Sequence, residues 1–482
     1  MGICTGTEFL SRLRDDREVW IEGQRVKDVT AHPSLRRGAA SMARLLDRQH
    51  DVELSQALTY TDPGSDERFA MAFLQPHSIA DVRRRGAALY DWAKWSNGML
   101  GRTPDYLNSS FMAFAGAADY FAQCRPEFAE NVRNYYEKMR REDLVLTHTL
   151  VNPQVNRHLT GQGLASPEVA LRVINETDAG LIVNGARMLA TLGPLSDEIA
   201  VFPSTVLKAA PEMKPYALAF AVANDTKGMK YICRDSYDHG KSLFDAPLSG
   251  RFEEMDCVVI FDHVLVPWER VFLYDAPELC NRAYAETSAV VHMMHQVVCK
   301  NLAKAEFIVG LLCAMTQASE RDKDMTVQGQ IAEAMWIAES MRAFLFSAEQ
   351  QAEKDQWGLY VPLRRPLDTA RNLFPKMYPR LVELVQLLGS SSLMATPCEA
   401  DLSNEIAPDV EQFFQLVHLE SRDRVALFRL AHDVAISGFG GRQALYERFF
   451  FGPQNVMASV YYGLYDKAHY VERVQELLAR PV

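Results

Sequence analysis

Several common catalytic signatures are absent from this sequence. It has no GxGxxG loop between a strand and a helix, no Walker A loop, no HExxH motif and no GxSxG nucleophile elbow. The glycine-rich segment LTGQGLA at 159–165 has no strand-like run before it, so it does not fit a dinucleotide-binding loop. The chain therefore shows no binding site of its own for NAD(P)H.

Long apolar runs, basic blocks and paired cysteines are also missing. The eight cysteines are scattered with no CxxC pair, which excludes a disulfide scaffold and a zinc site and favours reduced thiols. Apolar runs such as 308–315 are too short to span a bilayer, and the first twenty residues do not form a signal peptide. The net charge of −11 argues against nucleic-acid binding. We expect a cytoplasmic protein without nucleic-acid or membrane partners.

The pattern of apolar residues divides the 482-residue chain into three parts. Residues 1–145 are mainly of helical character, with charged and apolar residues at helical spacing from 79 to 95. Short β-branched runs between turn residues then predict strands from about 165 to 275, including one at 180–191. Helical patterns return from about 280, and GFGGR at 438–442 is expected to interrupt them. The sequence thus predicts an α+β fold that is mainly α.

One apolar stripe in the last part repeats at spacings of three and four, which predicts a helix with one buried face. Its members are Ile331, Met335, Ala338, Met341, Leu345 and Ala348.

A possible metal site is suggested by His292 and His295, which are three apart on a probable helix. A metal would need further ligands on facing helices, and no carboxylate partner is evident in the sequence. We therefore expect a packed, hydrogen-bonded histidine pair and no metal.

Six segments in order along the chain carry a family resemblance. The sequence closely resembles the 4-hydroxyphenylacetate 3-monooxygenase oxygenase family, from its first residues nearly to its last. The segments are GRTPDYLN (101–108), THTLVNPQVNR (147–157), ETDAGLIVNGARMLAT (176–191), LVPWERVF (265–272), YPRLVELVQLLGSSSLMATPCEADL (378–402) and GFGGRQALYERFFFG (438–452).

The resemblance implies an architecture related to acyl-CoA dehydrogenases. It predicts an N-terminal helical domain at 1–147, a β-barrel domain at 148–277 and a C-terminal four-helix domain at 278–482. It also implies a homotetramer.

The resemblance further implies a two-component flavin monooxygenase. A separate flavin reductase supplies FADH2, which reacts with O2 to form a C4a-hydroperoxide and hydroxylates a phenol beside its hydroxyl group. The expected substrate is 4-hydroxyphenylacetate, converted to 3,4-dihydroxyphenylacetate. Another phenol (a chlorophenol, a nitrophenol or a tyrosine-derived compound) is an alternative, as is a catalytically silent helical oligomer that binds flavin.

Arg102, Tyr106 and His148 are the expected catalytic residues. An arginine and a tyrosine hydroxyl can hold a phenol oxygen, and a neutral imidazole can accept its proton. Without the resemblance, Arg102 would equally suit a salt bridge with Asp105, and His148 a packed core histidine. The expected substrate contacts are Arg102, Thr103, Pro104, Asp105, Tyr106, His148, Ser204 and Thr205, before a closing loop at 207–215.

Flavin contacts follow from the same resemblance. Thr191 is expected near flavin N5 as a fixed donor that stabilises the hydroperoxide. The other expected contacts are His148, Thr149, Leu150, Gln154, Val155, Asn156, Arg157, Pro453, Gln454, Asn455 and Val456.

Three local features separate this chain from relatives. Leu189 replaces a common threonine, and Gly193 is an apparent insertion beside the expected flavin contacts. The related 4-hydroxybutyryl-CoA dehydratase uses an iron–sulfur cluster. Its N-terminal cysteine pair is missing around SNGMLGRTPDY, so the sequence excludes that activity although His292 and Cys299 are present.

Overall fold

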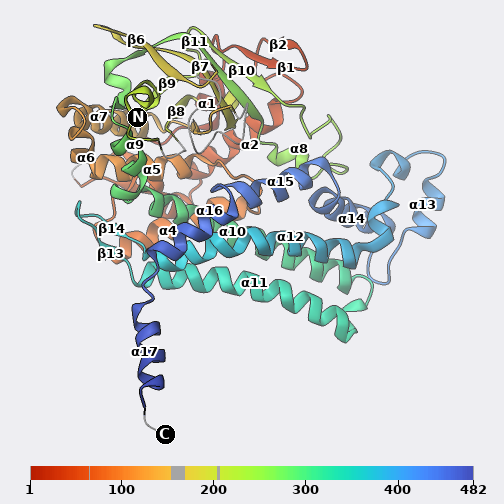
Figure 1. Cartoon of the computed structure of the whole chain (residues 1–482). Coiled ribbons are helices and arrows are strands. Elements are labelled where there is room, and N and C mark those ends of the chain that lie inside the picture. Colours follow the sequence, from red (N-terminus) through yellow and green to blue (C-terminus); the bar gives the residue numbers. More distant parts are fainter. Residues whose placement is uncertain (1, 64–65, 154–168, 204–206, 481–482) are drawn as a thin grey trace.

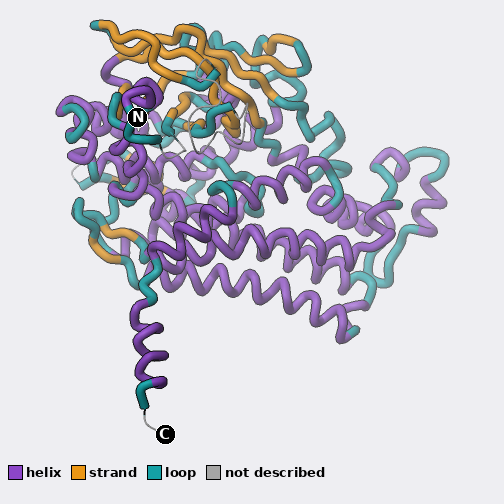
Figure 2. The backbone as a smooth tube through the Cα atoms, viewed as in Figure 1, coloured by secondary structure: helices purple, strands orange, loops and turns teal. Residues whose placement is uncertain are grey.

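A computed structural model describes residues 2–63, 66–153, 169–203 and 207–480. The N-terminal part is mainly helical, and the stripe at 79–95 is one helix, α4 (Ile79–Trp95). Figures 1 and 2 show these helices beneath a layer of strands. The remaining N-terminal elements are α1 (Gly6–Arg12), β1 (Val19–Ile21), β2 (Gln24–Val26), α2 (Arg36–Asp47), α3 (Ser55–Leu58), β3 (Thr59–Thr61), β4 (Arg68–Ala70), α5 (Pro104–Gly116), α6 (Ala118–Ala122) and α7 (Pro126–Glu142).

The middle part contains two sheets. The larger has the order β2-β1-β10-β11-β7-β6, and the smaller has the order β12-β9-β8-β5. Thr147 and Thr149 on β5 donate hydrogen bonds to the carbonyls of Thr191 and Met188 on β7, which joins the sheets. The strands are β5 (Leu146–Thr149), β6 (Arg172–Thr177), β7 (Gly180–Thr191), β8 (Glu198–Val201), β9 (Leu218–Ala223), β10 (Met229–Cys233), β11 (Asp256–Pro267) and β12 (Val271–Tyr274).

The strand predicted at 180–191 is confirmed, because β7 has these bounds. It pairs with β11 in antiparallel register, with Thr191 opposite Asp256 and Gly180 opposite Pro267. Directly opposed residues of antiparallel strands point to the same face of a sheet. The pairing therefore places Thr191 and Asp256 side by side.

Long helices form the C-terminal part, and most of their apolar side chains share one core. The stripe at 331–348 lies on α11 and is buried at five of its six predicted positions. Met335 is the error, since it is 43% exposed while Ala334 beside it is fully buried. The short helix α8 (Ser249–Phe252) lies between β10 and β11 in the middle part. The C-terminal helices include α9 (Pro277–Glu286), α10 (Ala289–Gln317), α11 (Met325–Gln350), α12 (Arg364–Met394), α13 (Ala407–Phe413), α14 (Ser421–Ala435), α15 (Gly438–Phe449), α16 (Gln454–Leu464) and α17 (Ala468–Leu478).

GFGGR at 438–442 does not interrupt the helices, contrary to the sequence-based expectation. The break lies just before it, at 436–437, and Ser437 caps α15 by accepting a hydrogen bond from Gly440 N. A Cβ on Gly440 would lie 2.2 Å from the Val434 carbonyl oxygen. The glycine thus permits a close approach of α14 to α15, and GFGGR is the first turn of α15.

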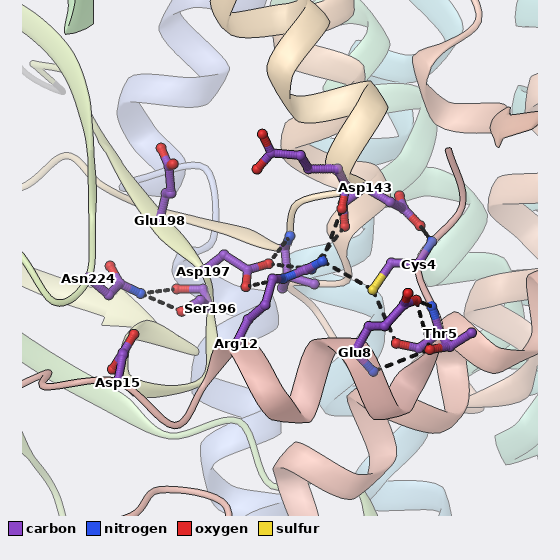
Figure 3. Close-up of polar contacts among 12 residues, drawn as sticks. Cys4, Thr5, Glu8, Arg12, Asp15, Asp143, Ser196, Asp197, Glu198 and Asn224 are labelled. Atoms are coloured by element: carbon purple, nitrogen blue, oxygen red, sulfur yellow. Dashed lines mark hydrogen bonds and ion pairs between the residues drawn. The ribbon is translucent and has the colours of Figure 1, made fainter. Parts of the chain in front are cut away.

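A polar cluster anchors α1 beside the start of β5 (Figure 3). Arg12 makes a two-pronged ion pair with Asp197, at 2.8 and 2.9 Å, and donates to the backbone carbonyl of Glu142. The same Asp197 carboxylate accepts a hydrogen bond from Val145 N, directly before β5. The cluster therefore sets where β5, and so His148, enters the sheet.

Helix α17 extends away from the rest of the chain at the C-terminus (Figure 1). None of its residues is buried. Among the described residues, no helix combines the length and the apolar character needed to cross a membrane.

Candidate active site

The turn that begins α5 holds Arg102 against the middle part of the chain. Pro104 occupies the first turn of α5, where a missing N–H costs no helical hydrogen bond. The backbone N–H groups of Gly101 and Arg102 both donate to Glu254 Oε1, at 2.8 and 2.6 Å. Glu254 is buried, so two peptide groups before α5 are tied to the segment leading into β11.

Aromatic rings surround the Arg102 guanidinium. Its central carbon lies 4.6 Å from the ring centre of Tyr106 and 4.2 Å from that of Phe450. Its Nη1 is buried and has no hydrogen-bond partner among the described residues. The alternative salt bridge with Asp105 is not formed, because Asp105 instead accepts hydrogen bonds from Thr103 and Gln296. Arg102 therefore holds a positive charge and at least one free donor inside an aromatic cage.

Tyr106 shows what this charge does to a phenol. Burial raises the pKa of Tyr106, and the Arg102 guanidinium acts against that effect, lowering the pKa. A positive charge favours the ionised form of any phenol placed at the same distance.

His148 packs against the ring of Tyr106. It is buried on β5, and its ring stacks on that of Tyr106 with centres 5.6 Å apart. Burial, assisted by the nearby Arg102 charge, holds the pKa of His148 well below its usual value. Its Nδ1 has no partner among the described residues. The structure thus brings together all three predicted catalytic residues and leaves a neutral imidazole nitrogen free.

Two tyrosines that the sequence did not single out face the same region. Tyr446 on α15 has its ring centre 5.8 Å from the Arg102 guanidinium, and Tyr284 on α9 is close enough for Arg102 to lower its burial-raised pKa. Both hydroxyls are buried without a hydrogen-bond partner in the described structure. Buried hydroxyls are normally paired, so unpaired ones fit a site that receives a polar ligand. Only their place in the fold reveals them.

Thr191, the last residue of β7, belongs to a charged cluster at the start of β11. Its hydroxyl donates to Asp256 Oδ1 at 2.6 Å. Arg442 on α15 donates to both oxygens of Asp256, at 2.8 and 3.0 Å, and to Glu254 at 3.0 Å. Burial opposes the ionised carboxylate, but Arg442 and Arg234 outweigh it and hold the pKa of Asp256 well below its usual range. The carboxylate is ionised and can only accept.

The contact with Asp256 bears on the expected donor role of Thr191 toward a flavin, which stays a prediction. A hydroxyl has one proton, and that proton is directed to Asp256. Thr191 is left with lone pairs, so it can only accept a hydrogen bond from a ligand.

An open hollow of about 550 Å³ adjoins this cluster, between β7, β10, β11 and α15. Met188, Leu189 and Leu445 provide apolar walls, while Asp256 and Arg442 provide a polar edge. An isoalloxazine ring has a flat apolar face and a polar edge, so these residues fit a flavin. Leu189, which replaces a threonine common in relatives, adopts a left-handed backbone with φ of 61° and presents its side chain here.

The remaining expected contacts are spread more widely. Thr149 and Leu150 directly follow His148, and the Leu150 carbonyl accepts from Arg187 at 2.9 Å. Pro453 caps α16, whose first turn contains Gln454, Asn455 and Val456. The hollow lined by Lys376 and Arg448 is separate, and Pro453, Gln454 and Asn455 also line it. The expected contacts Gln154, Val155, Asn156, Arg157, Ser204 and Thr205 lie outside the described residues.

The predicted histidine pair is only half correct. His295 Nε2 lies 2.8 Å from Glu349, but neither ring nitrogen of His292 has a partner among the described residues. Burial lowers the pKa of His292 well below its usual value, which keeps the ring neutral. The described part of the chain contains no group of three or more potential metal ligands.

Comparison with known proteins identifies the family. Residues 5–273 match the family model of the 4-hydroxyphenylacetate 3-hydroxylase N-terminal domain, and residues 280–479 match that of the 4-hydroxyphenylacetate 3-hydroxylase C-terminal domain. The chain belongs to this family of flavin-dependent oxygenases, as the sequence predicted.

Two relatives cover nearly the whole chain. The 4-hydroxyphenylacetate 3-monooxygenase oxygenase component of Thermus thermophilus is 47% identical, over 98% of this chain and 97% of that protein. The corresponding component from a Geobacillus species is 45% identical, over 98% and 96%. A crystal structure of the oxygenase component HpaB complexed with FAD and 4-hydroxyphenylacetate is similar with a TM-score of 0.94 and 47% identity, covering 98% of each chain. These likenesses confirm the expected fold class.

Proposed function

We propose that this chain is the oxygenase component of a two-component monooxygenase that hydroxylates 4-hydroxyphenylacetate beside its phenolic hydroxyl group. The observation that carries the proposal is a pair of buried nitrogen atoms without partners among the described residues, Arg102 Nη1 and His148 Nδ1, whose side chains both pack against the ring of Tyr106. One is a charged donor and the other belongs to a neutral imidazole. That combination suits a phenol, which needs a partner for its oxygen and an acceptor for its proton.

In this proposal each residue acts on the phenol in a separate way. Arg102 donates to the phenolic oxygen and favours its ionised form. His148 accepts the phenolic proton, which its neutral ring permits. Tyr106 packs against both side chains. An ionised phenol is richer in electrons at the carbon beside the oxygen, which is where hydroxylation occurs.

When bound, FADH2 delivered by a separate reductase would supply the electrons that activate O2, so that one oxygen atom of O2 enters the phenol and the other leaves as water. The protein's contribution is to bind the ring beside the cluster of Thr191, Asp256 and Arg442 and to exclude water. The segment at 207–215 is a candidate for water exclusion, because Leu207 is bound at both backbone groups by the Asn281 side chain of α9, at 2.8 Å each.

The proposal is tested with a panel of phenols and FAD that is reduced chemically, so that no reductase is needed. We expect 4-hydroxyphenylacetate to yield 3,4-dihydroxyphenylacetate with little release of H2O2. Chlorophenol, nitrophenol and tyrosine-derived compounds in the panel test the alternative substrates. Reduced FAD consumed with H2O2 release and no hydroxylated product from any phenol would refute the proposal.

We also propose that the chain forms a homotetramer in the cytoplasm. Helix α17 contacts little of its own chain, and α11 exposes Trp336 and Phe346 at 66% and 65%. Symmetric association would cover such surfaces. All eight cysteines are free, which suits a reducing compartment. Light scattering at micromolar concentration should give four times the 54.4 kDa chain mass, and a monomer would contradict the assembly.

A further inference from the structure

The Asp256 carboxylate is fully occupied by donors. Oδ1 accepts from Thr191 Oγ1 and Arg442 Nη2, and Oδ2 accepts from Arg442 Nε and Arg234 Nε, all between 2.6 and 3.0 Å. Two guanidinium groups keep it ionised. If the Thr191 proton turned elsewhere, one position on a largely buried carboxylate would lose its donor, which is unfavourable.

The direction of the Thr191 hydroxyl is therefore set by the protein. Its proton points to Asp256, and the described structure gives its oxygen no other donor or acceptor. The oxygen offers lone pairs alone. A ligand atom that meets it must carry a hydrogen to bind well, and a ligand atom with its own lone pair is repelled.

The central ring of a flavin changes in this respect with oxidation state. Atom N5 carries a hydrogen in the reduced ring and only a lone pair in the oxidised ring. We propose that Asp256 is a positioning residue that locks Thr191 as a hydrogen-bond acceptor, and that this lock makes the site prefer reduced over oxidised flavin. The inference rests on the proposed function, which puts the flavin ring beside Thr191, and on the family resemblance, which implies that N5 is the atom nearest to it.

Arg442 strengthens this lock. The same guanidinium that holds Asp256 also binds Glu254, which in turn holds the backbone of Arg102. Turning the Asp256 carboxylate would disturb both contacts. Hydrogen bonds through Glu254 thus link Asp256 and Arg442, at the proposed flavin site, to Arg102, which is proposed to bind the phenol.

Anaerobic equilibrium titrations with FAD and with chemically reduced FAD test the lock without turnover. The readout is the ratio of the two dissociation constants, oxidised over reduced. Thr191→Val keeps the shape and removes the hydroxyl, so it should weaken binding of reduced FAD and lower the ratio about tenfold. Thr191→Ser keeps the hydroxyl and should keep the ratio.

Asp256→Asn provides a second, independent arm. The side-chain amide of the new asparagine can donate a hydrogen bond to the Thr191 oxygen, so the Thr191 proton becomes free to bind a ligand. Oxidised FAD should then bind more tightly, and the ratio of the oxidised to the reduced dissociation constant should fall. Thr316→Val is the matched control, because it removes an equally buried threonine hydroxyl on α10 whose only partners are helix carbonyls. Its ratio should equal that of the wild type.

The outcomes separate this inference from the proposed function. An unchanged ratio in Thr191→Val or Asp256→Asn, or a lowered ratio in Thr191→Ser, would overturn the lock. Equal affinity of the wild-type protein for both forms would also overturn it while leaving the flavin site in place. Failure of the wild-type protein to bind either form would instead refute the proposed function.

Discussion

Replacing Arg102 by methionine tests the proposed phenol site most directly. Methionine keeps an unbranched side chain as far as the position of the arginine Nε, and it removes the charge and the donors that lie against the rings of Tyr106 and Phe450. The guanidinium has no carboxylate partner among the described residues, so its loss leaves no buried charge unpaired. We therefore expect a folded protein that binds reduced FAD.

The magnitude follows from the unpartnered Nη1. One hydrogen bond from a charged donor contributes about 1.5–3 kcal/mol. Losing it in the reaction should lower kcat/KM for hydroxylation by roughly 10- to 150-fold. Arg102→Lys keeps the charge but loses the planar guanidinium, so its defect should be smaller.

The assay measures 3,4-dihydroxyphenylacetate and H2O2 in the same reaction, with reduced FAD supplied. We expect Arg102→Met to consume reduced FAD and O2 at nearly the wild-type rate while releasing H2O2 in place of product. Arg422→Met removes an exposed arginine that also stacks on a ring, that of Phe244, and should behave like the wild type. Wild-type rate and coupling in Arg102→Met would refute the assignment.

Three further predictions concern ionisable groups. Because the pKa of His148 is well below 6.5, its imidazole is neutral at neutral pH. The rate of hydroxylation should therefore not fall between pH 6 and 8 through protonation of His148. His148→Gln should lower the product yield and raise H2O2 release. Burial raises the pKa of Asp105 from 3.8 to about 7. Between these two pH values the carboxyl group is protonated in the folded protein and ionised in the unfolded chain. The free energy of unfolding therefore falls as the pH rises from about 4 to about 7. Asp105→Asn should therefore raise the melting temperature relative to the wild type at pH 8 but not at pH 4.5, and an equal difference at both would contradict this. Glu447→Gln leaves Lys300 and Lys304 buried without a carboxylate, so it should lower the free energy of unfolding by about 3–5 kcal/mol, read from denaturant titration; a loss under 1 kcal/mol would contradict the pairing.

Much of the architecture was predictable because it rests on local periodicity. The helix at 79–95 and the strand at 180–191 have their predicted bounds, since the spacing of apolar residues directly reflects which face is buried. Met335 was mispredicted because a spacing of three or four allows several residues near the edge of a stripe, and neighbouring helices decide which of them is covered.

The catalytic residues came from the family resemblance, and their chemistry came from the tertiary structure. Sequence alone placed Arg102, Tyr106 and His148 in two segments more than forty residues apart, and it could not show that the Thr191 hydroxyl points to Asp256. That direction depends on Asp256, which reaches Thr191 only through strand pairing, and on Arg442, which arrives from a helix almost two hundred residues later. Hydrogen-bond direction and pKa depend on neighbours in space, so only the folded chain could decide them.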